Sequence, residues 1–142
     1  MRFRELRSQP DRAFLIRLER GEPVVSTLAT FSGEQNVKVG RFEGIGALLD
    51  AELGFYHLDR KDYDRFTVGD TEVLALLGNV SRLDGQPRIH AHLTVGEVDG
   101  TARGGHLFEA HVGATLEVFL LETPGEVARQ MDEEIGLPLL DL

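Results

Sequence analysis

Alternation of apolar and polar residues is the dominant pattern along this chain, and it predicts β-strands over most of its length. Short runs with a period of two residues are separated by turns that contain glycine, as is typical of strands with one buried face. We expect strands at 3–7, 13–18, 40–48, 51–57, 63–66, 71–83, 88–98, 105–112 and 114–121, with a turn at 8–11. The last strand is almost wholly apolar, which predicts a central strand covered on both faces.

One segment has helical rather than strand periodicity. Apolar residues recur at helical spacing just after Pro23, at Val24, Val25, Leu28 and Phe31. Proline suits the first turn of a helix, and Gly33 is a plausible stop. We therefore predict one main helix after residue 22.

The C-terminal segment has a weaker pattern. Residues 124–131 could form a short second helix, and the leucines of 137–140 are expected to pack on a neighbouring element or on a second subunit.

Two Asp-Gly pairs mark turns between long strands. Asp84-Gly85 and Asp99-Gly100 favour tight hairpin turns, because both residue types tolerate positive φ. Residues 71–112 should therefore form an antiparallel meander of three strands.

Composition narrows the class of protein. A chain of 142 residues with 42% hydrophobic residues is the size of a single domain, 1–142, with a real core. Without cysteine there is no disulfide, thiolate metal site or cysteine nucleophile. No apolar leader or membrane-length apolar run occurs, so we expect a cytoplasmic protein. The net charge of −9 opposes nucleic-acid binding by the surface as a whole.

The candidate chemistry lies in three of the five histidines. His90 and His92 flank Ala91 on a predicted strand, so both side chains point to the same face, about 6–7 Å apart at the backbone. That separation suits two ligands of one metal ion. His106, just past the second Asp-Gly turn, is the candidate third ligand. The alternative is that these histidines are a solvated face of a half-exposed sheet.

The position of His106 depends on strand register. A strict two-residue turn at Asp99-Gly100 would set His106 opposite Leu93, on the wrong side of the sheet. An added residue, from a three-residue loop or a bulge, would bring it to the face of His92. Gly104-Gly105 is a natural place for a bulge, so we expect an irregularity just before His106.

The first hairpin supplies polar partners on the histidine face. A turn at Gly85-Gln86 would set Ser81 opposite His90 and Asn79 opposite His92, whereas a turn at 84–85 would set Asn79 opposite His90. In both registers Asn79 and Ser81 could orient the imidazoles by hydrogen bonds.

Three nitrogen ligands would suit zinc, with other divalent transition metals such as copper, nickel or iron as alternatives. His57 and His111 are expected at the surface. Glu109 would be a candidate base, but simple alternation sets it on the opposite face from His106. No phosphate-binding loop or nucleophile elbow occurs, and Gly44-Ile45-Gly46 is expected to kink a strand. The catalytic residues, if any, are therefore not indicated.

Several motifs in order along the chain resemble the PPC domain ("plants and prokaryotes conserved"). They are Gly44-Ile45-Gly46-Ala47-Leu48, Leu53-Gly54-Phe55-Tyr56, Leu77-Gly78-Asn79-Val80-Ser81, His90-Ala91-His92 and Gly104-Gly105-His106-Leu107-Phe108-Glu109. The resemblance implies an α+β fold, with a curved, mostly antiparallel sheet packed against one main helix, and a homotrimer. It also implies a bound metal ion, with zinc as the first candidate, on His90, His92 and His106.

The resemblance leaves two functions open. Prokaryotic members resemble stand-alone metal-binding domains, which fits this chain. Plant members join the domain to an AT-hook that binds DNA, but this chain has no Arg-Gly-Arg-Pro hook. A DNA-associated or protein-interaction module is therefore the alternative, by family association only, and the small-molecule ligand is unknown.

Overall fold

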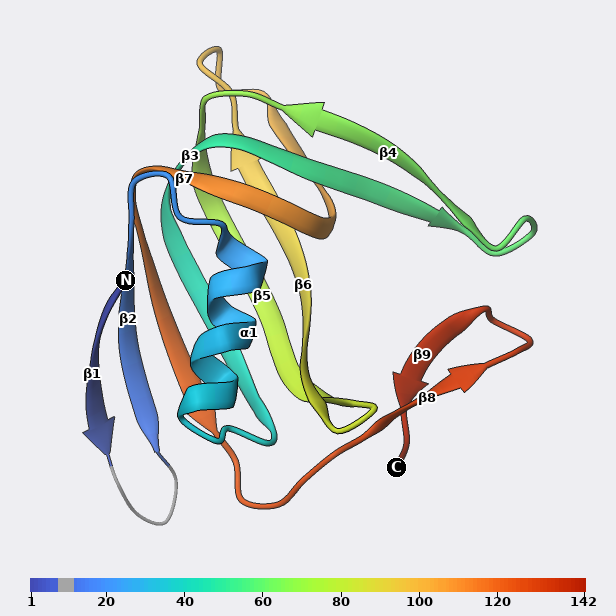
Figure 1. Cartoon of the computed structure of the whole chain (residues 1–142). Coiled ribbons are helices and arrows are strands. Elements are labelled where there is room, and N and C mark those ends of the chain that lie inside the picture. Colours follow the sequence, from blue (N-terminus) through green and yellow to red (C-terminus); the bar gives the residue numbers. More distant parts are fainter. Residues whose placement is uncertain (8–11) are drawn as a thin grey trace.

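The computed structural model describes residues 1–7 and 12–142. The turn expected at 8–11 lies outside the described residues. Within the described part, one helix and nine strands follow one another in the order β1 (Arg2–Arg7), β2 (Ala13–Glu19), α1 (Val24–Glu34), β3 (Gly40–His57), β4 (Asp62–Val68), β5 (Thr71–Leu83), β6 (Gln86–Gly96), β7 (Ala102–Glu122), β8 (Arg129–Asp132) and β9 (Leu137–Leu140) (Figure 1). The predicted class, a mostly antiparallel sheet with one main helix, is confirmed.

Seven strands form one sheet in the order β1-β2-β7-β6-β5-β3-β4, and β7 also pairs with β3, which closes the sheet on itself. The extra pairing arises because β3 and β7 are long enough to be used twice. Residues 40–46 of β3 lie beside 116–122 of β7, and residues 48–54 lie beside 106–112. The sheet therefore curls on itself, and the meander β5-β6-β7 predicted from the two Asp-Gly turns forms its middle.

Glycine lets the two long strands bend across each other. The pairing of β3 shifts register on both sides of Gly46, where the sequence predicted a kink. A Cβ added at Gly46 would lie 2.1 Å from the carbonyl oxygen of Thr115, so no larger residue fits between the strands. The strands expected at 40–48 and 51–57 are thus one bent strand, and so are those expected at 105–112 and 114–121.

Helix α1 fills the hollow of the curved sheet, against β6 and β7 (Figure 1). Its buried residues include Leu28 and Phe31, and the Phe31 ring meets Phe14 of β2 edge-on at 5.2 Å. The helix runs through Gly33 rather than stopping there. The left-handed residue that ends it is Asn36, at φ 52°, since asparagine tolerates this conformation better than most residues.

The other face of the sheet is largely open. Along the second half of β7, Leu116, Val118 and Leu120 are buried, whereas Phe119 is 46% and Leu121 38% exposed. The prediction that this strand is covered on both faces is therefore wrong: the helix covers one face only.

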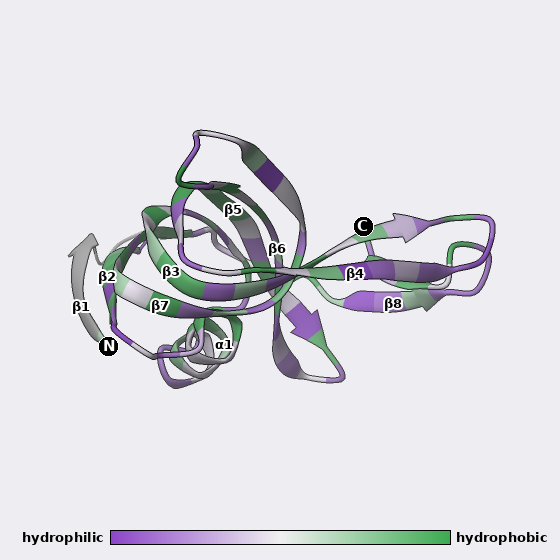
Figure 2. Ribbon diagram, turned by 90° about the horizontal axis from the view of Figure 1, so that it is seen from above, coloured by the Kyte–Doolittle hydropathy of each residue, from purple (hydrophilic) through white to green (hydrophobic). Residues whose placement is uncertain are grey.

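The C-terminal segment forms strands, and the helix predicted at 124–131 is wrong. The backbone amide of Arg82 donates to the carbonyl of Val127 at 2.9 Å, and the backbone amide of Asp141 donates to the carbonyl of Ala128 at 3.0 Å. These bonds hold the segment extended beside the end of β5, and β8 pairs with β9. Figure 2 shows β4 and β8, both rich in hydrophilic residues, projecting to one side of the body that contains α1.

In the described part of the chain, no helix has the length and apolar character needed to cross a membrane.

The bend at Gly46 yields a test of the fold. We expect Gly46→Ala to lower the free energy of unfolding by about 3 kcal/mol, because the added methyl would overlap fixed backbone. Gly69→Ala is the matched control, since no atom lies within 4 Å of its added Cβ, and should change stability by less than about 0.5 kcal/mol. Urea denaturation followed by circular dichroism measures both. Equal midpoints for the two variants would contradict the steric account of the bend.

Candidate metal centre

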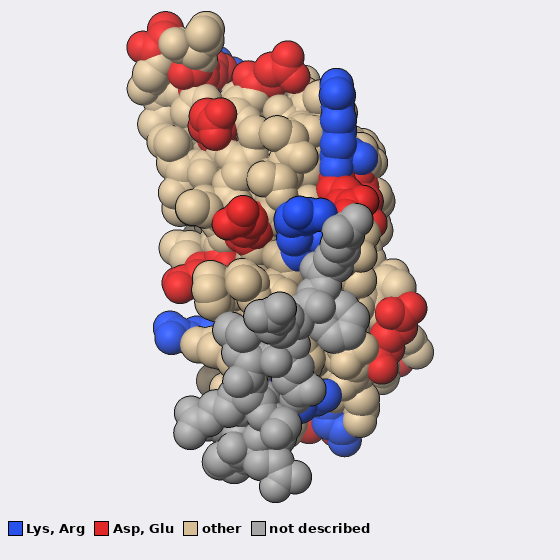
Figure 3. Space-filling model, turned by 90° about the vertical axis from the view of Figure 1, so that its left-hand side faces the viewer, with Lys and Arg blue, Asp and Glu red and all other residues tan. Residues whose placement is uncertain are grey.

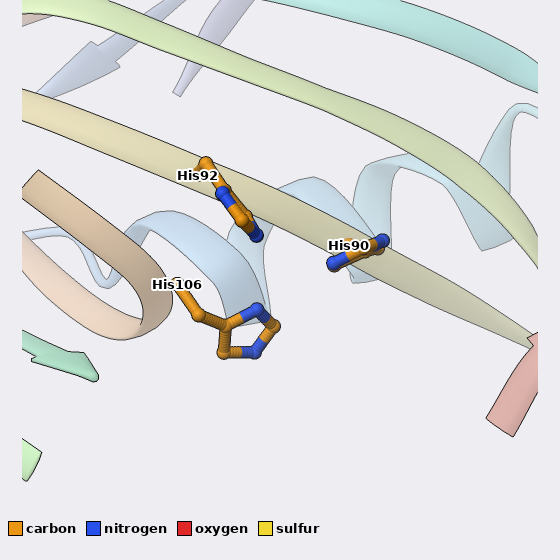
Figure 4. A group of neighbouring side chains, drawn as sticks. All are labelled: His90, His92 and His106. Atoms are coloured by element: carbon orange, nitrogen blue, oxygen red, sulfur yellow. The ribbon is translucent and has the colours of Figure 1, made fainter. Parts of the chain in front are cut away.

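Three imidazoles converge on the open face of the sheet (Figure 4). His90 and His92 come from β6, and His106 comes from β7. Their ring centroids are 5.4 Å apart for His90–His92, 5.3 Å for His90–His106 and 5.6 Å for His92–His106. One ligand nitrogen from each ring lies within 4.8 Å of the other two. Ligands of a tetrahedral zinc are roughly 3.3 Å apart, so small side-chain rotations would bring the three nitrogens into a ligand geometry.

The loop between β6 and β7 sets this convergence. Gly100 donates to the carbonyl of Glu97 at 2.8 Å, Glu97 donates to the carbonyl of Thr101 at 2.9 Å, and Gly100 has φ 83°. These features define a three-residue loop with a left-handed glycine. His106 therefore pairs with His92 and not with Leu93, as a two-residue turn would require.

The bulge expected at Gly104-Gly105 is absent from the β6–β7 pairing, where Thr94 pairs with Gly104 and Leu93 with Gly105 in regular steps. The loop alone supplies the extra residue. Gly105 serves close packing instead, since an added Cβ there would lie 2.7 Å from the carbonyl oxygen of Gly54.

The first hairpin turns at Asp84 and Gly85, which have φ 51° and 75°. Of the two registers considered from the sequence, this is the one that pairs Asn79 with His90. Ser81 then faces Arg88. Both polar residues lie on the histidine face, as expected.

Arg129 connects these polar residues to the histidines. Its guanidinium donates to Ser81 Oγ at 2.8 Å, to Asn79 Oδ1 at 2.9 Å, to the Pro138 carbonyl at 2.8 Å and to His90 Nδ1 at 3.3 Å. Asn79 and Ser81 therefore act on His90 through Arg129 rather than by direct hydrogen bonds. No local pattern in the sequence indicates Arg129, because β8 reaches this place only through the tertiary path of the C-terminal segment.

Aromatic rings fix the position of His106. The centre of the Tyr63 ring, from β4, lies 5.1 Å from the centre of the His106 ring. The centre of the Phe108 ring lies 5.0 Å from the centre of the His106 ring. His106 Nδ1 is buried and has no hydrogen-bond partner within the described residues. A buried nitrogen without a partner is costly, and a metal ion is one kind of partner that would satisfy it.

Two of the imidazoles, those of His90 and His106, are poised to be neutral. Burial, followed by the nearby His90 and His92, lowers the pKa of His106 to about 4. Burial also lowers the pKa of His90, and the charge of Arg129 adds to the effect. A neutral imidazole offers its lone pair to a metal without first losing a proton, so this part of the site fits a metal ion at neutral pH.

The other candidates have structural partners elsewhere. The Glu109 carboxylate accepts hydrogen bonds from the amides of Val25 at 2.6 Å and Ser26 at 3.1 Å, so it caps the start of α1, on the helix side of the sheet. His111 contacts Asp50 at 2.8 Å, and His57 contacts Asp64 at 2.7 Å. None of the three joins the histidine cluster.

Comparison with known proteins agrees with this architecture. Residues 6–124 match the model of the Plants and Prokaryotes Conserved (PCC) domain. A metal-containing protein from Archaeoglobus fulgidus is 37% identical over 92% of this chain and 93% of that chain, with a TM-score of 0.86. A plant- and prokaryote-conserved protein from Pyrococcus horikoshii is 30% identical over 99% of this chain and 95% of that chain, with a TM-score of 0.87. A proposed DNA-binding protein from Bacteroides thetaiotaomicron is 27% identical over 98% and 96%, with a TM-score of 0.87. No curated protein matches the chain.

The pKa of His106 gives a direct test of the cluster. In protein treated with a chelator, His106 should titrate near pH 4, and His111, whose pKa is raised by its hydrogen bond to Asp50, should titrate above its usual value. Because the folded pKa of His106 is lowered, its neutral form favours folding above pH 6.5, and that contribution is lost as pH falls from 6.5 towards 4. The NMR resonances of the two imidazole rings, followed against pH, measure the pKa values of His106 and His111. A pKa for His106 at or above that of His111 would contradict the buried cluster.

Proposed function

Because the chain belongs to the Plants and Prokaryotes Conserved domain family, we propose that it is a metal-binding protein that holds one divalent ion on His90, His92 and His106. The observation that carries the proposal is the convergence of three imidazoles within ligand reach of one another. The likeness to a metal-containing protein at 37% identity supports it. Zinc is the ion that three imidazole ligands suit best, ahead of copper, nickel or iron.

Three protein ligands would leave the fourth position of a tetrahedral ion open to a small molecule or to water, which the ion would polarise. The protein's own residues would hold this geometry. Arg129 positions His90, and the rings of Tyr63 and Phe108 position His106. In the described part of the chain, no carboxylate forms a hydrogen bond or ion pair with these three imidazoles. The proposal is therefore metal binding, without an assigned base.

DNA association is the alternative, and the likeness to a proposed DNA-binding protein at 27% identity is what favours it. Charge argues against it, because phosphate contacts need clustered Lys and Arg, while the chain carries a net charge of −9. On the described part of the surface in Figure 3, acidic and basic residues are interspersed. We therefore place metal binding first.

We also propose self-association, as the family resemblance implies, into a homotrimer. Apolar side chains are exposed on neighbouring strands of the open face: Ile45 at 61%, Leu77 at 56%, Phe119 at 46% and Leu121 at 38%. They surround Glu43 of β3, which pairs with both Leu77 and Phe119. Such a patch favours burial against another chain. Since Leu77 pairs with His92, the metal centre would border that interface.

Metal content tests the proposed function. Protein purified without a histidine tag should contain about one zinc per chain. We expect His106→Ala to weaken zinc binding by at least about 100-fold, since even loss of an outer hydrogen-bond partner costs about 10–100-fold. His111→Ala, on the same strand but outside the cluster, should keep the wild-type content. Elemental analysis after dialysis measures all three proteins, and equal zinc in both variants would refute the assignment of ligands.

The mass in solution tests the assembly. Wild-type protein should elute with a light-scattering mass three times the 15.7 kDa of the chain. Phe119→Lys places a charge in the proposed interface and should shift the mass towards 15.7 kDa, because burying an unpaired charge is costly. Val98→Lys, at an exposed hairpin tip, is the control and should stay trimeric. A monomeric wild-type protein would overturn the trimer.

A further inference from the structure

We propose that the metal centre takes a small ligand with an oxyanion group, a carboxylate or phosphate, and that Arg88 is its second contact. The inference rests on the proposed function, because the ligand would bridge the metal ion and the guanidinium. It adds the chemical class of the ligand and a specificity residue outside the three-histidine set.

Arg88 is placed to reach over the histidines. It lies two residues before His90 on β6, so its side chain is on the same face, with the two α-carbons about 6–7 Å apart. It is exposed, and it pairs across the hairpin with Ser81. Within the described part of the chain, Arg88 makes no hydrogen bond or ion pair, whereas Arg129 makes four hydrogen bonds and Arg65 is bound to Glu52 at 3.2 Å. Its guanidinium is therefore free to bind a ligand.

The surroundings of the cluster are cationic. The guanidinium of Arg129 lies 3.3 Å from His90. That of Arg65 lies 3.7 Å from the centre of the Phe108 ring, which in turn contacts His106 at 5.0 Å.

Local charge here is opposite to that of the whole molecule. The chain carries a net charge of −9, yet in the described residues no carboxylate pairs with the three imidazoles. Three neutral imidazole ligands would leave the double positive charge of the metal ion uncompensated. Three arginines lie nearby: Arg88, which has no partner among the described residues, and Arg129 and Arg65, which have hydrogen-bond partners. In a site walled by the rings of Tyr63 and Phe108, such an excess of positive charge favours an anion.

The shape of the donors favours an oxyanion over a simple halide. A guanidinium presents a planar fork that matches two oxygens of a carboxylate or phosphate. One oxygen would occupy the open position of the metal ion, and another would accept hydrogen bonds from Arg88. A neutral ligand would gain only the metal contact.

Cobalt substitution separates this inference from the proposed function. Zinc is replaced by Co²⁺ in the full-length, tag-free protein, and cobalt per chain is measured first by elemental analysis. Sodium acetate, inorganic phosphate and uncharged acetamide are then titrated separately, while the visible absorption of the bound cobalt is recorded. We expect saturable spectral changes with acetate or phosphate, and none with acetamide at the same concentrations. The two anion titrations distinguish a carboxylate from a phosphate ligand.

The matched pair of variants is Arg88→Gln and Arg82→Gln. Both remove one positive charge from the same hairpin, but Arg82 pairs with Pro87 and lies on the other face, near Asn36. Arg88→Gln should keep its cobalt and bind the preferred anion about tenfold more weakly, equivalent to about 1.4 kcal/mol, while Arg82→Gln should match the wild type. Full cobalt content without any anion response, or equal affinities in the two variants, would overturn the inference and leave metal binding intact. A protein that takes up no cobalt would overturn both.

Discussion

The two-residue period of β6 is the constraint on which the rest of the molecule depends. Ile89, Ala91 and Leu93 face the helix and are buried, so His90 and His92 have to face away from it. Hydrogen bonding to β5 on one side and β7 on the other then fixes what stands next to each histidine. The core and the histidine cluster thus lie on two faces of one strand, and the packing that stabilises the core orients the histidines.

The bends in β3 and β7 determine what surrounds that strand. Because β3 and β7 are long, the end of β3 pairs with β4 on one side and with the first half of β7 on the other, and Tyr63 of β4 contacts His106 across it. The hairpin of β8 and β9 reaches from Arg129, beside His90, to the β3–β4 hairpin, where Tyr56 donates to the Ile135 carbonyl at 2.7 Å. An open face of a sheet would otherwise leave the rings of His90 and His106 in bulk water, where their pKa values would stay near 6.5.

Local sequence patterns predicted most of the strands and the helix. They did not predict which neighbouring strands are continuous as one bent strand. Helical spacing of Leu28 and Phe31 predicted α1, and the Asp-Gly pairs predicted both hairpins. Gly113 looked like the end of a strand, but in the fold it is a point of close approach, with an added Cβ 3.1 Å from the backbone of Leu48. The sequence could not distinguish these roles, because the difference lies in which distant strand packs against the glycine.

The same limit applied to the site. Strand periodicity alone places His90 and His92 on the same face. The position of His106 relative to them depends on the loop length, which the sequence does not fix. Arg129 had no local signal at all, since its partners Ser81 and Asn79 lie about fifty residues earlier: the separations are 48 and 50 positions. Residues held by long-range hydrogen bonds are visible only once the path of the chain is known.

The three-residue loop at 98–100 has a consequence for how this protein can vary. If the hairpin kept a three-residue loop, deletion of one residue there would turn every later side chain of β7 to the opposite face, so that Leu107 would stand where His106 does and the core would lose an apolar row. Changes of two residues would preserve both faces. Relatives that retain the histidines but differ by one residue in the spacing between the second and third should therefore differ by one residue in the length of this loop, unless a compensating irregularity arises in the same hairpin.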